Sequence, residues 1–193
     1  EVSEFGYPVI DLRDQAPIVA MDVLRQVGGS ADVVYHGMHN NEFRRSAGMP
    51  DVTMLDALDP DFSHQPEGHK AVYATKLLEG GLAHAVLEHR PSDQDPETGE
   101  TYAISMNRTP DGKILELSPQ IASDLEAGVD RFTDGLLYIL PASAFTDTPN
   151  SDHEVFAQNK VAPLAVVRVG ASLGPVIVTP NSYSVRHGNE YQD

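Results

Sequence analysis

Cysteine and tryptophan are both absent from this chain of 193 residues. A protein without cysteine can form no disulfide, and it offers neither a thiol nucleophile nor a thiolate ligand for a metal ion. Catalysis by a cysteine nucleophile and zinc sites built on cysteine are therefore excluded. The same absence leaves the redox compartment open.

Positive charge is scarce. The chain has 13 Lys and Arg residues against 29 Asp and Glu residues, which gives a formal net charge of -16 at pH 7. A field of this sign repels the phosphate backbone of DNA and RNA, so we expect no nucleic-acid partner. A small anionic ligand can still bind where a few basic side chains gather in one pocket.

Long hydrophobic runs are missing as well. No apolar stretch approaches the ~20 residues of a membrane-spanning helix, and no basic segment followed by an apolar one marks a signal peptide. We therefore expect a soluble protein with no membrane partner, and we favour a cytoplasmic location. With 40% hydrophobic and 22% charged residues, the composition is that of a globular chain rather than a disordered one.

Short apolar runs separated by turn residues predict an α+β protein. The length favours a single domain, with residues 1–30 as an N-terminal helical extension, 31–180 as the core and 181–193 as a tail. Helices dominate the first half and strands the second, so we expect a mixed or antiparallel core sheet with peripheral helices. The expected strands are 31–37, 69–75, 101–106, 113–117, 135–141, 161–169 and 175–179, and the expected helices are 16–29, 40–45 and 77–89.

Two polar segments are expected to be loops. Residues 46–70 contain several Pro, Gly and Asp residues, and a loop of this length is often a lid or a binding loop. Residues 90–100 carry alternating acidic side chains, but Gly99 is displaced by one place from the glycine of a calcium-binding EF-hand loop. We therefore assign no calcium ion to this segment.

Two of the expected strands end in polar groups. Tyr35-His36-Gly37 and Tyr73-Ala74-Thr75 each follow a run of β-forming residues, as expected where two strands deliver side chains to one cleft. Gly37 lets a ligand approach the backbone, because it has no Cβ atom. The basic residues near these motifs in the sequence, which could neutralise an anionic ligand, are Arg44, Arg45, Lys70 and Lys76.

The order of these motifs resembles that of ADP-ribosyltransferase-like proteins of the His-Tyr-Glu type. This superfamily includes the poly(ADP-ribose) polymerases, diphtheria-type toxins and RNA 2′-phosphotransferases. The resemblance covers residues 31–170. It rests on Tyr35-His36-Gly37, on Val72-Tyr73-Ala74-Thr75 with a helix after it, on Leu137-Tyr138-Ile139-Leu140-Pro141 with Phe145, and on Glu154 shortly before Val161-Ala162-Pro163-Leu164.

The resemblance implies a split, strongly bent β-sheet that grips NAD in the cleft between its halves. It also implies a mono-ADP-ribosyltransferase or an NAD glycohydrolase that breaks the bond between nicotinamide and ribose. The acceptor would be a protein, a small molecule or water. NAD would be a substrate, and no metal is assigned to the site.

The resemblance further implies a role for each matching residue. His36 would hold a ribose hydroxyl, the backbone of Gly37 would pair with the nicotinamide carboxamide, and Thr75 would line the same pocket. Tyr73 would stack on the nicotinamide ring, since an aromatic face holds a planar leaving group. Glu154 would stabilise the oxocarbenium-like transition state, since a carboxylate stabilises developing positive charge. Arg44 and Lys70 are the cations that we expect beside the dinucleotide.

One feature departs from the family pattern, and it leaves the catalytic carboxylate open. Asp152 stands two places before Glu154, where the family has a confirming partner residue. Glu116 and Glu190 are the alternatives if the strand assignment is wrong. A carboxylate in so acidic a chain is, taken alone, most often a solvated charge.

Two other classes of function stay open. His36, His39, His64 and His69 could form the metal site of a hydrolase, since imidazole is a ligand for zinc. The spacing of His36 and His39 is not a helical pair, and no zinc signature is present, so this alternative ranks lower. The other alternative is a non-catalytic acidic module for binding or for a structural assembly.

Overall fold

The structure is a computed structural model of the chain. It describes residues 2, 6–30, 32–39, 58, 61–62, 70–89, 104–106, 113, 115–149 and 151–185. The helix expected at 40–45, the loop at 90–100 and most of the loop at 46–70 lie outside these residues.

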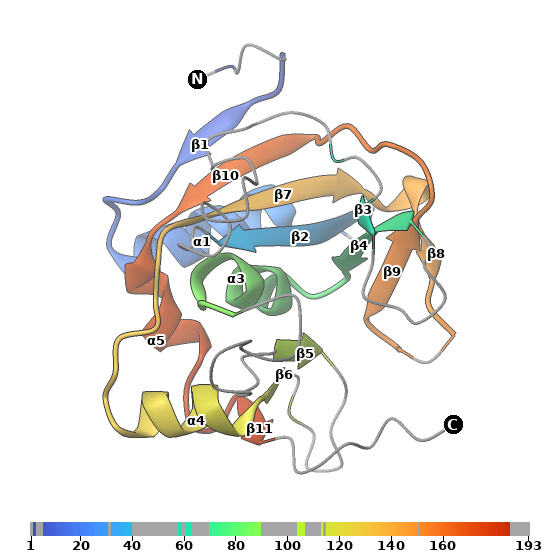
Figure 1. Cartoon of the computed structure of the whole chain (residues 1–193). Coiled ribbons are helices and arrows are strands. Elements are labelled where there is room, and N and C mark those ends of the chain that lie inside the picture. Colours follow the sequence, from blue (N-terminus) through green and yellow to red (C-terminus); the bar gives the residue numbers. More distant parts are fainter. Residues whose placement is uncertain are drawn as a thin grey trace.

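An eight-stranded mixed sheet forms the centre of the described part of the molecule (Figure 1). Its strands follow the order β1-β10-β7-β2-β4-β9-β8, and β3 pairs with β4. The pair β1–β10 is parallel, and the other pairs are antiparallel. The strands are β1 (Val9–Asp11), β2 (Val33–His39), β3 (Asp61–Phe62), β4 (Lys70–Thr75), β7 (Gly135–Pro141), β8 (Thr146–Asp147), β9 (Glu154–Ala157) and β10 (Ala165–Val169).

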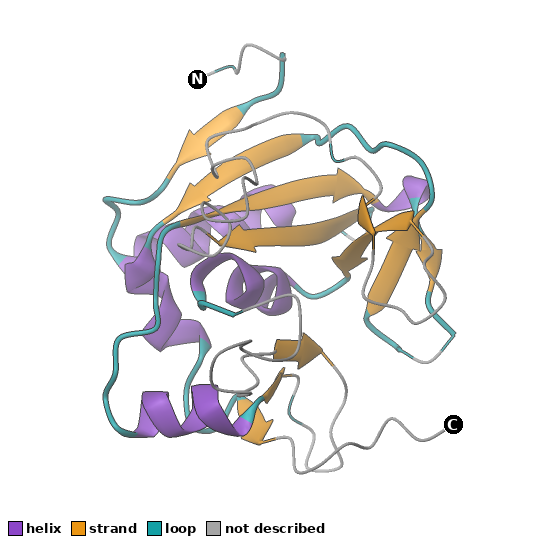
Figure 2. Cartoon of the chain, in the orientation of Figure 1, coloured by secondary structure: helices purple, strands orange, loops and turns teal. Residues whose placement is uncertain are grey.

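A smaller sheet and several helices complete the described structure, so the predicted α+β class is confirmed (Figure 2). The three strands of the smaller sheet are, in spatial order, β11 (Tyr183–Val185), β6 (Leu115–Leu117) and β5 (Ile104–Met106). The helices are α1 (Pro17–Gly28), α3 (Leu78–Val86), α4 (Pro119–Glu126) and α5 (Gly174–Ile177), with single 3-10 turns η1 (Ala142–Ala144) and η2 (Ala171–Leu173).

Strand β7 separates two hydrophobic cores. It lies between β10 and β2, and its residues from Gly135 to Leu140 are buried. Leu137 and Ile139 enter one core with α1, α3, α4 and α5, while Leu136 and Tyr138 enter a second core on the opposite face. Alternate side chains of a strand point to opposite faces, so an unbroken apolar run is typical of a strand covered on both sides. The strand expected at 135–141 is confirmed.

The main sheet is nearly divided between β2 and β4. Strand β2 pairs with β7 along its whole length, from Val33 to His39. Among the described residues, it shares with β4 only the pair Tyr35–Thr75. Beyond that pair the two strands separate, and β4 instead pairs with β9 and β3. This division leaves room for side chains between the two parts of the sheet.

Helix α3 packs on β2 with its backbone close to the strand. A Cβ atom added to Gly37 would lie 2.0 Å from the carbonyl oxygen of Gly81 and 2.6 Å from the backbone nitrogen of Ala85. One added to Gly81 would lie 2.6 Å from Cβ of Tyr35. Contacts this short allow only hydrogen on either glycine. The space that a side chain at Gly37 would take is therefore occupied by the helix.

One expected strand is wrong. Residues 175–179 contain the end of α5 instead, directly after the 3-10 turn η2. Pro175 stands in the first turn of α5, where its fixed φ suits a helix and its missing N–H is not needed. A short apolar run does not distinguish a buried strand from a buried helical turn by periodicity, which explains the error.

Both ends of the described chain join the sheets. Strand β1 forms an edge of the main sheet, and Ala20, Met21 and Leu24 of α1 are buried in the first core. Part of the segment expected to be a tail forms β11, which pairs with β6. The expected hairpin strands β5 and β6 pair in antiparallel fashion.

The described helices include none whose length and apolar character would let it cross a membrane. This agrees with the absence of a long hydrophobic run in the sequence.

Replacing Gly37 by Ala should destabilise the protein by about 3 kcal/mol, because the added methyl group meets backbone atoms that cannot rotate away. Gly128→Ala is the control. Gly128 has a φ of 74° and nothing within 4 Å of an added Cβ, so only the backbone penalty of about 1–2 kcal/mol applies. Urea denaturation of the two variants and the parent measures both effects. A smaller loss for Gly37→Ala than for Gly128→Ala would contradict the packing of α3 described above.

Candidate active site

A pocket opens where β2 and β4 separate. Its volume is about 190 Å³, and residues of β2, β4, α3, β5 and β9 line it. The residues selected from the sequence that line this pocket are His36, Gly37, Tyr73, Thr75 and Glu154. The lining also includes Tyr35, Ala74, Gly81, His84 and Ile104. The fold therefore brings together candidates that lie far apart in the sequence.

His36 bridges the gap between the two strands. Its Nδ1 atom lies 2.6 Å from the carbonyl oxygen of Tyr73, beyond the last backbone pair of β2 and β4. A carbonyl oxygen can only accept, so Nδ1 of His36 carries the hydrogen and donates it. The ring of His36 also meets Tyr138 edge-on, with the centroids 6.1 Å apart. These two contacts fix the orientation of the imidazole.

Tyr73 and Thr75 project from the same face of β4, because they are two residues apart. The half-buried ring of Tyr73 lies beside Phe156 of β9, with the ring centroids 6.4 Å apart. Thr75 is 5% exposed, and its Oγ1 accepts a hydrogen bond of 3.0 Å from the backbone nitrogen of Leu77. The hydroxyl proton of Thr75 is left to donate, so this residue can hydrogen-bond an acceptor on a ligand.

Glu154 enters the pocket from β9, a strand that the sequence analysis did not predict. It stands directly opposite Thr75 in the register of β4 and β9, so the two side chains share one face. The backbone N–H of Glu154 donates to Oγ of Ser151 at 2.9 Å, which holds the start of the strand. Burial raises the pKa of the Glu154 carboxyl above its ordinary value. A desolvated carboxylate gains most when positive charge develops beside it.

The two alternative carboxylates do not compete for this place. Glu116 lies on β6 of the smaller sheet and is not among the residues that line the pocket. Glu190 lies outside the described residues. Asp152, two places before Glu154, is exposed.

The structure describes little of the expected cation cluster. Lys76, which directly follows the pocket residue Thr75, forms an ion pair of 2.6 Å with Asp147. Lys70 begins β4, but its side chain lies outside what the structure describes, as do Arg44 and Arg45 entirely. The role of Arg44 and Lys70 beside an anionic ligand stays a prediction.

A cluster of histidine rings lies against the pocket, and the sequence analysis missed its central members. The centroids of His84 and His89 are 5.0 Å apart, and those of His39 and His89 are 4.2 Å apart. His84, on α3, is the member that lines the pocket. The signal that could have identified His84 is a polar ring among the small residues of a predicted helix.

The surroundings of His84 favour its neutral form. Burial lowers the pKa of His84 well below the ordinary 6.5, and the nearby His89, His36 and His39 lower it further. The ring is partly accessible even so, and it lines the pocket. Its accessible part therefore belongs to the lining of the pocket.

No metal-binding group of three or more His, Cys, Asp or Glu side chains occurs among the described residues. His36 and His39 are three residues apart on β2, so they point to opposite faces of the strand. His64 and His69 lie outside the described part of the chain. The described residues thus hold no ligand set for the hydrolase alternative.

No protein-family model, no curated protein and no solved structure matches this chain. The resemblance to ADP-ribosyltransferase-like proteins therefore stays a prediction, and the choice of a function depends on the pocket itself.

His84 should make the protein less stable in acid. Because its folded pKa is depressed, the unfolded state binds a proton below pH 6.5 while the folded state does not. Stability is then lost as the pH falls from the ordinary value towards the folded pKa, by at most about 1.4 kcal/mol per pH unit. Urea denaturation of the parent and of His84→Asn between pH 7.5 and 5 measures how much stability His84 costs as the pH falls. A difference between the two proteins that does not change with pH would contradict the assignment.

Proposed function

We propose that the protein cleaves the bond between nicotinamide and ribose in NAD, as a mono-ADP-ribosyltransferase or an NAD glycohydrolase. The observation that carries this proposal is that His36, Tyr73 and Glu154, from three separate segments of the sequence, line one pocket. Their order along the chain resembles that of the His-Tyr-Glu proteins. Together they supply a ligand for ribose, an aromatic surface for the leaving group and a carboxylate for the developing charge.

The size of the pocket suits the reacting end of the dinucleotide. Its 190 Å³ is less than the ~300–1,000 Å³ of sites that enclose a whole drug-sized ligand. The nicotinamide ring and part of its ribose would occupy the pocket, and the rest of NAD would lie outside it. Arg44 and Lys70 are proposed to neutralise the pyrophosphate, which the net charge of -16 would otherwise repel.

The reaction requires the protein mainly to orient NAD and to stabilise the positive charge that develops on the ribose. Nicotinamide leaves with the electron pair of the glycosidic bond, and positive charge develops on C1′ and the ring oxygen of the ribose. Tyr73 would stack on the departing ring, while His36 would hold a ribose hydroxyl. The carboxylate of Glu154 would stabilise the positive charge, and its partial burial strengthens that interaction.

Glu154→Gln should lower the turnover of NAD by about 10²–10³-fold, because the amide keeps the shape of the side chain but loses its charge. The affinity for NAD should change little, since this interaction is strongest in the transition state. Nicotinamide release measures turnover, and calorimetry measures binding. Glu116→Gln is the matched control and should behave as the parent, because Glu116 does not line the pocket. Equal turnover in Glu154→Gln and the parent would show that the carboxylate is misassigned.

Tyr73→Ala should instead weaken the binding of NAD and of free nicotinamide by about tenfold, a typical value for an aromatic pair of ~0.5–1.5 kcal/mol. Tyr73→Phe keeps the ring and should bind as the parent does. Calorimetry with nicotinamide alone tests the stacking surface without requiring turnover. Failure of the parent to bind either ligand would favour the non-catalytic module.

A further inference from the structure

His84 lines the pocket, and the cleavage step proposed above does not use it. It contributes a titratable ring from α3, whereas Tyr73 and Glu154 come from β4 and β9. We propose that Nε2 of His84 accepts the proton of an attacking water molecule, so that the protein hydrolyses NAD. This inference builds on the proposed function and chooses the hydrolase over the transferase.

A chain of two hydrogen bonds determines which nitrogen of His84 carries the hydrogen. Nδ1 of His89 lies 2.9 Å from the carbonyl oxygen of Leu87, which can only accept, so Nδ1 of His89 is the donor. When the His89 ring is neutral, its Nε2 is therefore the acceptor. Nδ1 of His84 lies 3.4 Å from that atom and donates to it. The lone pair of His84 is then on Nε2, the nitrogen on the other side of the ring from His89.

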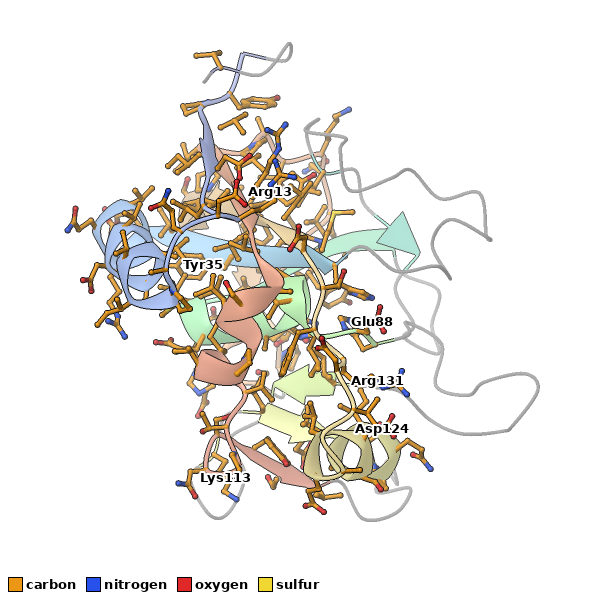
Figure 3. All side chains as sticks on the ribbon, turned by 90° about the vertical axis from the view of Figure 1, so that its left-hand side faces the viewer. Arg13, Tyr35, Glu88, Lys113, Asp124 and Arg131 are labelled. Carbon is orange, nitrogen blue, oxygen red and sulfur yellow. The ribbon has the colours of Figure 1, made fainter. Side chains whose placement is uncertain are left out.

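The backbone around His89 holds these two hydrogen bonds in place. Residues directly after α3 pair with the segment at Phe132, through Glu88 N to Arg131 O and Thr133 N to Val86 O, both at 2.9 Å. The side chain of Arg131 also forms ion pairs with Asp124 and Glu88 (Figure 3). His89 is therefore proposed as a positioning residue on a segment held by backbone hydrogen bonds, and His84 is the residue that lines the pocket.

The electrostatic surroundings suit a base that starts neutral and holds a proton only briefly. His36 and His39 of β2 and His89 after α3 all disfavour a charge on His84. Glu154 of β9 is the acidic residue among the described residues of the lining, and a carboxylate in the same pocket would attract the imidazolium once it forms. A general base of this kind typically contributes ~10²–10⁴-fold to a rate.

The C1′–N bond breaks and nicotinamide leaves with the electron pair. The oxygen of water forms a bond to C1′, and a proton of that water moves to Nε2 of His84. The products are ADP-ribose and nicotinamide, and His84 releases its proton to solvent when they leave.

Hydrolysis and pyridine exchange both begin with cleavage of the C1′–N bond, so comparing them separates the role of His84 from the cleavage step. Water must lose a proton as it attacks C1′, whereas the ring nitrogen of 3-acetylpyridine attacks without losing one. Hydrolysis and pyridine exchange are measured side by side on the parent, His84→Asn, His89→Gln and His89→Ala. In His84→Asn the side-chain amide can still donate to His89 but offers no base. In His89→Gln the amide oxygen replaces Nε2 as the acceptor. His153→Gln is the matched control, because His153 does not line the pocket.

We expect His84→Asn to lose ~10²-fold or more in hydrolysis while pyridine exchange stays within a few-fold of the parent. His89→Ala should lose hydrolysis to a smaller extent, His89→Gln should restore most of it, and His153→Gln should match the parent. The ratio of hydrolysis to exchange should fall in acid for the parent and not for His84→Asn.

Three results would overturn the inference. Equal losses of hydrolysis and exchange in His84→Asn would mean that His84 has only a structural role, and unchanged hydrolysis would exclude it as a base. A parent that exchanges pyridines but does not hydrolyse NAD would refute water as the acceptor and keep the proposed cleavage. A parent that does neither would refute the proposed function itself, and this inference with it.

Discussion

The contact between α3 and β2 is the constraint on which the pocket depends. Gly37 and Gly81 let the backbone of the helix lie against the strand, at distances where any Cβ atom would overlap. At this distance His84, on the helix, and His36, on the strand, reach the same small volume. A displacement of the helix would move His84 relative to the residues of β2 that line the same pocket. Close packing therefore serves the site directly, because rigid neighbours transmit such displacements.

The division of the sheet between β2 and β4 provides the second requirement, a place for polar groups inside the fold. Where the backbone pairing stops, the side chain of His36 bonds the carbonyl oxygen of Tyr73 in its place. The carboxyl of Glu154 and the ring of His84 are both shifted by burial towards their neutral forms. Each shift lowers the stability of the free protein at some pH. Groups held in such environments are common where a substrate later compensates for them.

The sequence allowed much of the main sheet to be predicted, since β7, β2 and β4 are β-forming or apolar runs bounded by turn residues. The prediction failed where a short segment fits the pattern of a strand and that of a helix equally well. The apolar run at 175–179, which contains the end of α5, has too few residues to reveal a period, and β9 has only four residues, of which Glu154 alone is polar. Periodicity needs more turns or more pleats than these segments contain.

By itself, the sequence determined the class of the fold and the types of the candidate groups, because composition and local periodicity are properties of neighbouring residues. It also singled out His36, Tyr73 and Glu154 through their order along the chain. Only the tertiary structure decided that Thr75 faces Glu154, that Gly37 serves the helix, and that His84 joins the pocket. Those relations depend on strand register and on the distance between a helix and a sheet. Both are set by packing between distant segments, which no local pattern encodes.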